Sequence, residues 1–226
     1  MHRAIVICLV LAALSVCAAC NSAPVTPVAT APAPQPTPAA TPTEVEWRAA
    51  VLGAFDSAQP RASRQRSETV LADGTRHQTV VEFAPPASYH IVADGATELI
   101  VIGERVYLKD SGAWTEANIP AGSLIDRDFA KRLERTLSDL TWLGSETLNG
   151  AALHVYQFKS AIKVGEDERI GQFKVWINPA DQLPYQLVIN GETAALDNRT
   201  GQITGVPTTT TIKYEYDPTI AISAPK

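Results

Sequence analysis

The sequence predicts an α+β domain with about nine antiparallel strands and two helices. Between Arg66 and Tyr216, short segments alternate apolar and polar residues, which is the period of a half-buried strand. Turn signals such as Asp73-Gly74 separate these segments. Parallel strands need crossovers of about a dozen residues or more, so the short connections favour an antiparallel meander.

A first helix is predicted from Glu44 to Ser57. Thr43 is a typical helix cap, and acidic residues follow it in the first turn. Apolar residues then recur at nearly helical spacing, at Val45, Ala49, Leu52 and Phe55. Gln59-Pro60 ends the pattern, because proline lacks the N–H that a helix interior needs.

Five strands are predicted before the second helix. They cover Ser67–Leu71, Arg76–Phe83, Tyr89–Val92, Glu98–Ile102 and Arg105–Lys109. The fourth of these is apolar on both faces, which indicates a central strand.

The second helix is predicted from an apolar stripe at steps of four, four and three residues. Asp126 precedes the stripe as a plausible cap, and the stripe consists of Phe129, Leu133, Leu137 and Leu140. Charged residues occupy the other faces. We therefore expect this helix to lie on a sheet rather than inside a core.

Four more strands are predicted, at Leu153–Lys159, Ile170–Asn178, Tyr185–Ile189 and Thr208–Tyr216. Asn190-Gly191 is a turn signal, and residues 193–206 are expected to form a long hairpin excursion. Residues 166–168 are predicted to be a solvated acidic turn, because they lack the alternating ligands and glycine of a calcium loop.

The predicted strands carry more apolar surface than two short helices can cover. Residues 98–102, 153–158 and 185–189 are apolar on both faces. Such a sheet must fold onto itself as a sandwich, meet a partner, or curve around an apolar ligand. The choice among these three is the functional question.

Residues 1–19 have the three parts of a secretory signal peptide. Arg3 gives a basic start, Ala4–Leu14 is an unbroken apolar run, and small residues follow it. The run is shorter than the roughly 20 residues that span a membrane, and no stop-transfer pattern follows. The sequence therefore predicts export.

Ala18-Ala19-Cys20 resembles the lipobox of bacterial lipoproteins, in which a signal peptidase cuts before a cysteine that carries lipid. Cys17 stands where that motif usually has Leu, and Cys17 itself is a rival attachment site after the bulky Val16. An ordinary secreted protein cut near Ala19 is the other alternative. We predict lipid such as palmitate at Cys20, anchoring the protein to the outer, extracytoplasmic side of the bacterial cell membrane.

Residues 20–43 are predicted to be a disordered linker, and residues 44–226 the folded domain. The linker has seven prolines, much Ala and Thr, and no charge. Such a tract cannot bury enough surface to fold, so it stays extended and semi-rigid. At up to about 3.1 Å per residue it could hold the domain tens of ångströms from a membrane.

The composition argues against several classes of function. Once Arg3 is removed with the signal peptide, 18 of the 19 basic residues remain against 24 acidic ones, a net charge of about −6. This balance is unfavourable for binding nucleic acid or for electrostatic docking on anionic lipid. All three cysteines lie in the export region, so the domain has no disulfide and no thiolate ligand.

No set of catalytic residues is visible in the sequence. His77, His90 and His154 are the histidines of the domain, and none has metal-ligand spacing with another ligand. Nucleophile-elbow, zinc-protease, P-loop and dinucleotide motifs are absent from the sequence. We therefore expect no enzyme, no cofactor and no bound metal.

Three stretches resemble a known family: Tyr89–Trp114, Phe173–Pro184 and the closing strand that ends at Tyr214–Pro218. Their strand and turn patterns resemble the LolA/LolB-like superfamily of bacterial lipid and lipoprotein carriers, particularly the LppX/LprG-type lipoproteins. The resemblance implies a strongly curved antiparallel half-barrel of about nine or more strands. Two or three helices would cover the concave side over an apolar cavity for acyl chains.

The resemblance also implies residues that line the cavity, although sequence leaves open which face is concave. The predicted set is Val81, Phe83, Ile91, Leu99, Val101, Phe129, Leu133, Phe173, Val175, Ile177, Leu187 and Ile189.

The expected function is that of a lipid-anchored extracytoplasmic lipoprotein that binds lipid or acyl chains and carries or presents them at the cell envelope. The alternative is a non-carrier sensor or assembly module on the same fold, as in RseB-type relatives. The expected partners are the acyl ligand, the membrane through Cys20, and an unidentified envelope protein, but not nucleic acid.

Overall fold

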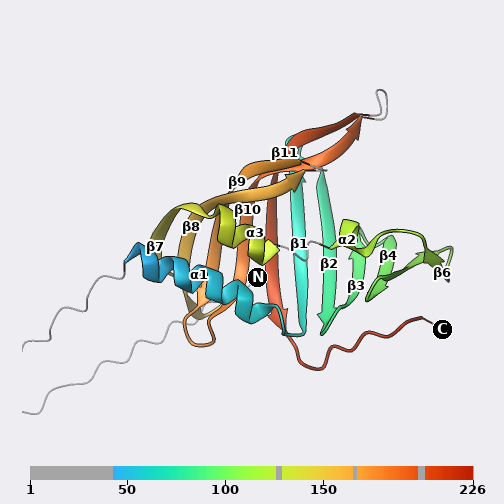
Figure 1. Ribbon diagram of the computed structural model, residues 1–226, viewed down its shortest axis with the longest axis horizontal. Coiled ribbons are helices and arrows are strands. Elements are labelled where there is room, and N and C mark those ends of the chain that lie inside the picture. The colour runs from blue at the N-terminus through green and yellow to red at the C-terminus, as the bar shows by residue number, and fades with distance from the viewer. Residues whose placement is uncertain (1–42, 126–128, 165–166, 198–201, 226) are drawn as a thin grey trace, which may run out of the picture. The chain divides into compact units, whose positions relative to one another are not determined.

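One antiparallel sheet of eleven strands forms most of the part of the chain that the structure describes (Figure 1). The strand order is β6-β5-β4-β3-β2-β1-β11-β10-β9-β8-β7, so β6 and β7 are edges and the sheet is not closed into a barrel. The strands are β1 (Ser63–Leu71), β2 (Arg76–Ala84), β3 (Ser88–Ala93), β4 (Thr97–Ile102), β5 (Arg105–Asp110), β6 (Ala113–Ala117), β7 (Ser138–Leu148), β8 (Ala151–Val164), β9 (Asp167–Asn178), β10 (Leu183–Asp197) and β11 (Gln202–Tyr216).

The computed structural model describes residues 43–125, 129–164, 167–197 and 202–225. These residues belong to one unit, Thr41–Lys226. The predicted signal peptide, Cys20 and nearly all of the predicted linker lie outside the described residues, as do Asp126 and Glu166. Asp167 and Glu168, predicted as part of an acidic turn, are instead the first residues of β9. Within the described ranges, no helix is long and apolar enough to cross a membrane.

The first helix, α1 (Glu44–Ala58), begins as the sequence predicts. Thr43 Oγ1 accepts a hydrogen bond from the Glu46 N–H, and the Glu46 carboxylate accepts one from the Thr43 N–H at 2.6 Å. This reciprocal capping box satisfies two N–H groups that would otherwise lack partners at the helix start.

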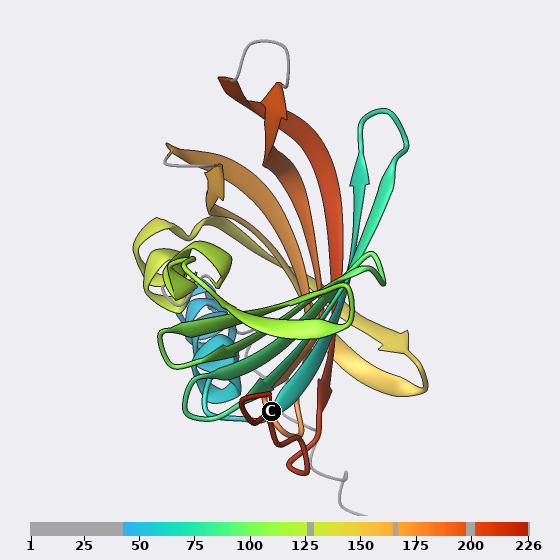
Figure 2. The ribbon, with the colours of Figure 1, turned by 90° about the vertical axis from the view of Figure 1, so that its right-hand side faces the viewer.

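The helices α1 and α3 (Phe129–Thr136) lie on one face of the sheet, over β7 to β10 (Figures 1 and 2). The sheet curves around them, so this is its concave face. A short helix, α2 (Ala121–Leu124), covers the same face further along, where Ala121 packs against Val101 and Val106. The predicted α+β half-barrel with helices on its concave side is confirmed.

The main core lies between the sheet and the helices α1 and α3. The rings of Phe158 and Phe173 stack 5.2 Å apart at 6°, and Phe55 meets Phe129 edge to face at 5.2 Å. The buried residues are Val51, Ala54, Phe55, Leu133, Leu137, Leu140, Tyr156, Phe158, Phe173, Val175, Ile177 and Leu187. The side chains beneath these two helices are therefore closely packed against one another.

The helix predicted to include Leu140 ends earlier than the apolar stripe indicates. α3 stops at Thr136, and Ser138 already pairs with Lys159 as the first residue of β7. Leu137 and Leu140 are buried in the same core as Leu133 although they are not helical. Pairing with β8 outweighs the helical spacing here, and it adds a strand that the sequence did not reveal.

The turn predicted at Asn190-Gly191 is wrong, because both residues lie inside β10. A Cβ on Gly191 would come within 2.5 Å of Ile162 Cδ1, and one on Gly171 within 3.3 Å of Ile162 Cγ2. The two glycines let the Ile162 side chain of β8 lie close to the backbones of β9 and β10. Gly191 therefore serves packing rather than a turn.

Candidate functional site

Cross-strand pairing from β11 through β1, β2 and β3 to β4 places three rows of side chains on one face. The middle row is Tyr214, Gln65, Val81, Ile91 and Leu99, each paired directly with the next. One neighbouring row is Ile212, Ser67, Thr79, Ala93 and Thr97, and the other is Tyr216, Ser63, Phe83, Tyr89 and Val101. We call these three rows the central strip.

The central strip belongs to the concave face, because Ile212 and Tyr214 pack against the core beneath α1. No residue of the strip is Asp, Glu, Lys or Arg. Val81, Phe83 and Leu99 are only partly buried. The strip is therefore an uncharged surface of apolar and neutral polar side chains that the described helices cover incompletely.

The convex face of the same strands carries a chain of ion pairs instead. Arg64 Nη2 lies 2.7 Å from Glu82 Oε1, and Glu82 Oε2 lies 3.2 Å from His90 Nδ1. His90 Nε2 lies 3.0 Å from Glu98 Oε1, and Lys109 Nζ lies 2.6 Å from Glu98 Oε2. Because successive strand residues point to opposite faces, these charges cannot reach the central strip.

The ion pairs perturb the two glutamates that join them. Hydrogen bonding from Arg64 is the largest cause that lowers the pKa of Glu82, and hydrogen bonding from Lys109 is the largest for the pKa of Glu98. His90 contributes to both shifts. The neighbouring cations thus stabilise the charged form of both carboxylates. The described residues contain no cluster of side chains able to hold a metal ion.

A pocket of about 700 Å³ opens at the end of the sheet where β1 begins and β11 ends. The segments that line it are the α1–β1 turn, the ends of β2 and β3, and the chain after β11: Pro60, Arg61, Ala62, Ala84, Pro85, Ser88, Tyr216, Asp217, Pro218, Ile220, Ala221 and Ile222. Its volume is within the range of small-ligand sites, but polar groups interrupt its apolar lining.

A smaller pocket of about 370 Å³ lies between α1 and the turn that joins β9 to β10. Small residues of α1 form one wall, and side chains of β8, β9 and the turn form the other: Ala49, Ala50, Gly53, His154, Tyr156, Ile177, Asn178, Pro179 and Gln182.

Comparison with known proteins identifies the fold. No protein-family model matches the chain, and no curated protein matches it. The crystal structure of the lipoprotein LppX from Mycobacterium tuberculosis superposes with a TM-score of 0.56 at 13% identity, covering 80% of this chain and 100% of LppX. The domain shares the fold of LppX.

A second solved structure agrees. LprF from Mycobacterium bovis matches this domain with a TM-score of 0.53 at 12% identity, covering 81% of this chain and 97% of LprF. At such identities the likeness shows the fold alone, so the site must be argued from the residues of this chain.

The twelve predicted cavity residues fall into two groups in the folded domain. Val81, Phe83, Ile91, Leu99 and Val101 lie in the central strip. Leu133, Phe173, Val175, Ile177 and Leu187 are buried in the core, with the partly buried Phe129 and Ile189 packed against it. Among the twelve, Ile177 lines one of the two pockets. Their role in ligand binding stays a prediction.

Gln65 and Tyr214 are not among the predicted cavity residues, yet they face each other across β1 and β11 in the middle of the strip. Parity within each strand could have placed them on one face. The pairing of the first strand with the last, however, leaves no local signal in the sequence.

Proposed function

We propose that this protein is a lipid-anchored extracytoplasmic lipoprotein that binds lipid or acyl chains on its concave face. It carries or presents them at the cell envelope and is a binding protein rather than an enzyme. The observation that supports this proposal is the central strip, an uncharged and partly exposed face whose opposite side carries the ion pairs.

Apolar surface in contact with water is unfavourable by about 25 cal/mol for each Å². Val81, Leu99 and Ile212 would lose that contact beneath an acyl chain. An acyl chain brings no charge, so it needs no counter-ion from a face that has none. An anionic ligand would find no Lys or Arg in the strip.

The export signal and the fold of LppX support the same proposal. LppX, which is named a lipoprotein, shares this fold. Lipid at Cys20 would keep the domain near a membrane, and the proline-rich linker would set how far the concave face can reach.

Native mass spectrometry of the exported Cys20→Ala chain tests ligand binding. We expect the protein to retain lipid from its host, or to take up a fluorescent acyl probe after delipidation. If no bound lipid is detected by mass and the delipidated protein takes up no probe, the proposal is overturned. The convex-face variant Arg64→Gln is the matched control, since it lies outside the strip and should bind like the wild type.

Labelling with radioactive palmitate tests the anchor separately. The wild type should incorporate label, and the Cys20→Ala variant should not. Continued labelling of that variant would indicate that the lipid is attached at Cys17.

The packed core beneath α1 and α3 favours a second candidate, a sensor or assembly module that binds another envelope protein. The stacked Phe158 and Phe173 leave that part of the interior filled by side chains. Crosslinking of the wild-type chain in cells would distinguish the two. A specific protein partner, together with failure to bind acyl probes, would support the module.

A further inference from the structure

The middle of the central strip holds two polar side chains, Gln65 on β1 and Tyr214 on β11. They are direct partners across the two strands, which places their Cβ atoms about 5 Å apart. Neither the Gln65 amide nor the Tyr214 hydroxyl has a hydrogen-bond partner within the described ranges. Val81, on the other side of Gln65, offers no polar group. Polar groups without a hydrogen-bond partner are unusual on a partly buried face.

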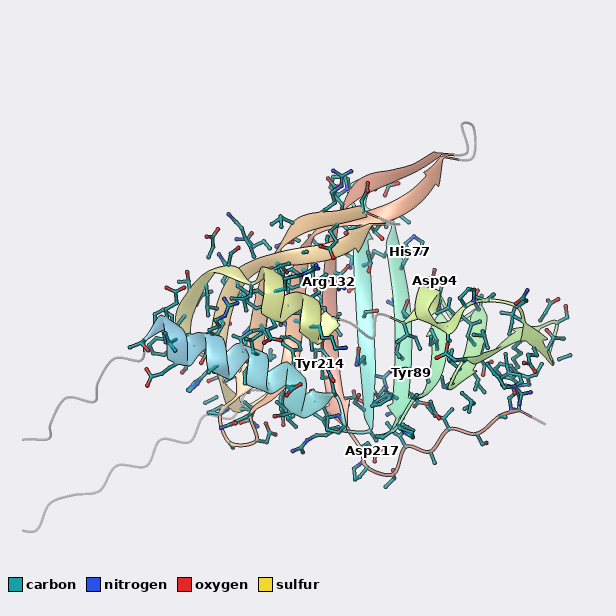
Figure 3. The ribbon with its side chains drawn as sticks, viewed as in Figure 1. His77, Tyr89, Asp94, Arg132, Tyr214 and Asp217 are labelled. Atoms are coloured by element: carbon teal, nitrogen blue, oxygen red, sulfur yellow. The ribbon has the colours of Figure 1, made fainter. Side chains whose placement is uncertain are left out.

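Tyr214 differs in its hydrogen bonding from Tyr216, the next residue on the same face of β11. The two rings stack 6.4 Å apart, but the Tyr216 hydroxyl donates a hydrogen bond to the Pro184 carbonyl at 2.9 Å. Figure 3 labels Tyr214 on the sheet, and the residue is partly buried. The Tyr216 hydroxyl therefore has a structural partner, whereas the Tyr214 hydroxyl has no hydrogen-bond partner among the described residues.

The surroundings of Tyr214 are uncharged. Burial raises the pKa of its hydroxyl, and no described charged side chain contributes to the shift. At Tyr216, by contrast, the charges of Asp181 and Arg61 contribute to the pKa beside the larger effect of burial.

The arginines of the helices that cover this face are bonded elsewhere. Arg48 donates to the main-chain carbonyls of Glu134 and Leu137 at 2.8 and 3.0 Å. Arg132 donates to the carbonyl of Ala161 at 3.1 Å. Since no described charge acts on the Tyr214 hydroxyl either, a carboxylate buried beside it would gain hydrogen bonds but no nearby opposite charge, which makes its burial unfavourable.

We propose that Gln65 and Tyr214 hydrogen-bond the uncharged carbonyl oxygen of an esterified acyl chain, and so select acyl esters over free fatty-acid anions. The amide and the hydroxyl can both donate, and a carbonyl oxygen has two lone pairs to accept them. The apolar residues Val81, Ile91 and Leu99, which continue the row, would contact the chain. This inference rests on the proposed binding of acyl chains.

The test compares two probes with the same labelled chain, pyrene-dodecanoic acid and its methyl ester, at a pH where the acid is ionised. The ester lacks the charge and carries one additional methyl group. The protein is the exported Cys20→Ala chain. Loss of one hydrogen bond should weaken ester binding about three- to tenfold in Tyr214→Phe and in Gln65→Met. Acid binding should stay within about twofold of the wild type, because burial of the unpaired carboxylate beside these groups is unfavourable and the acid would keep its carboxylate in water.

Tyr216→Phe is the matched control, since it removes a hydroxyl of the same kind one pair along the strand. It should lower the melting temperature by breaking the bond to Pro184. The control for selectivity is the convex-face variant Arg64→Gln, which should leave the ratio of ester to acid affinity unchanged. Tyr214→Phe should leave the melting temperature unchanged or higher, because the lost hydroxyl has no described partner.

The outcomes separate this inference from the proposed function. If the wild type binds both probes and the two variants change neither affinity, or change both equally, the polar pair has no selective role while acyl binding stands. An equal loss of melting temperature in Tyr214→Phe and Tyr216→Phe would show a structural hydroxyl and overturn the inference. Failure of the wild type to bind either probe would overturn both proposals.

Discussion

Thr136 Oγ1 accepts a hydrogen bond from the main-chain N–H of Ala161 at 3.0 Å. Arg132 Nε donates to the carbonyl of the same residue at 3.1 Å. β7 begins only at Ser138, which pairs with Lys159, so Ala161 lies on a part of β8 that β7 does not reach. Side chains of α3 thus satisfy the main-chain groups that an edge strand would leave exposed.

Thr136→Val tests this contact between helix and sheet edge. The substitution keeps the shape of the side chain but leaves the Ala161 N–H without its acceptor, which should lower the free energy of unfolding by about 1–3 kcal/mol. Urea unfolding measures the change. Thr141→Val, at an exposed position of β7, should stay within about 0.5 kcal/mol of the wild type. Equal midpoints for the two variants would contradict the role of Thr136.

The convex ion pairs predict sensitivity to acid. A carboxyl whose pKa is lower in the folded state stabilises the fold above its unfolded pKa, and this contribution is lost as the pH falls through the folded value. Since the pKa values of Glu82 and Glu98 are both lowered from 4.5, the urea midpoint should fall as the pH drops below about 4.5. A Glu82→Gln/Glu98→Gln variant should show a shallower fall.

Asp56→Asn, on an exposed position of α1, is the control for the acid series. It should follow the wild-type curve, because Asp56 is not part of the ion-pair chain. An identical pH dependence of the double variant and the wild type would show that these carboxylates do not contribute to acid sensitivity.

Gly191 predicts a steric effect that a second substitution should relieve. In Gly191→Ala the new Cβ would lie 2.5 Å from Ile162 Cδ1, so Ile162 must move. We expect a loss of about 1–3 kcal/mol in the free energy of unfolding. Ile162→Val removes the clashing Cδ1, and the double variant should therefore be less destabilised than the sum of the two single ones. Simple additivity would show that Ile162 does not limit this position.

The sequence was informative wherever a structure depends on neighbouring residues. Alternation over Ile170–Asn178 predicts most of β9, and the capping residues at Thr43 predict the start of α1. The strand parity that selected Val81 and Leu99 also placed them on one face. These properties follow from local periodicity, which needs no knowledge of the tertiary structure.

The predictions from sequence fail where contact with a segment distant along the chain determines the local structure. Asn190-Gly191 has the composition of a turn, but Ile162 from another strand requires the glycine there. Leu140 continues a helical stripe, but pairing with β8 makes its segment a strand. The direct pairing of Gln65 with Tyr214 joins the first strand to the last, so the candidate polar pair is visible only in the folded sheet.

Gly53 predicts a stabilising substitution at the smaller pocket. It lies inside α1, where glycine is less favourable than alanine by about 1 kcal/mol, and a Cβ added to it would meet no atom within 4 Å. Gly53→Ala should therefore raise the free energy of unfolding by about 0.5–1 kcal/mol, measured by urea unfolding. Ala49→Gly, on the same wall of the pocket, should lower it by a similar amount. A loss of stability in Gly53→Ala would show that the space beside α1 is filled in solution, as it would be by a bound ligand.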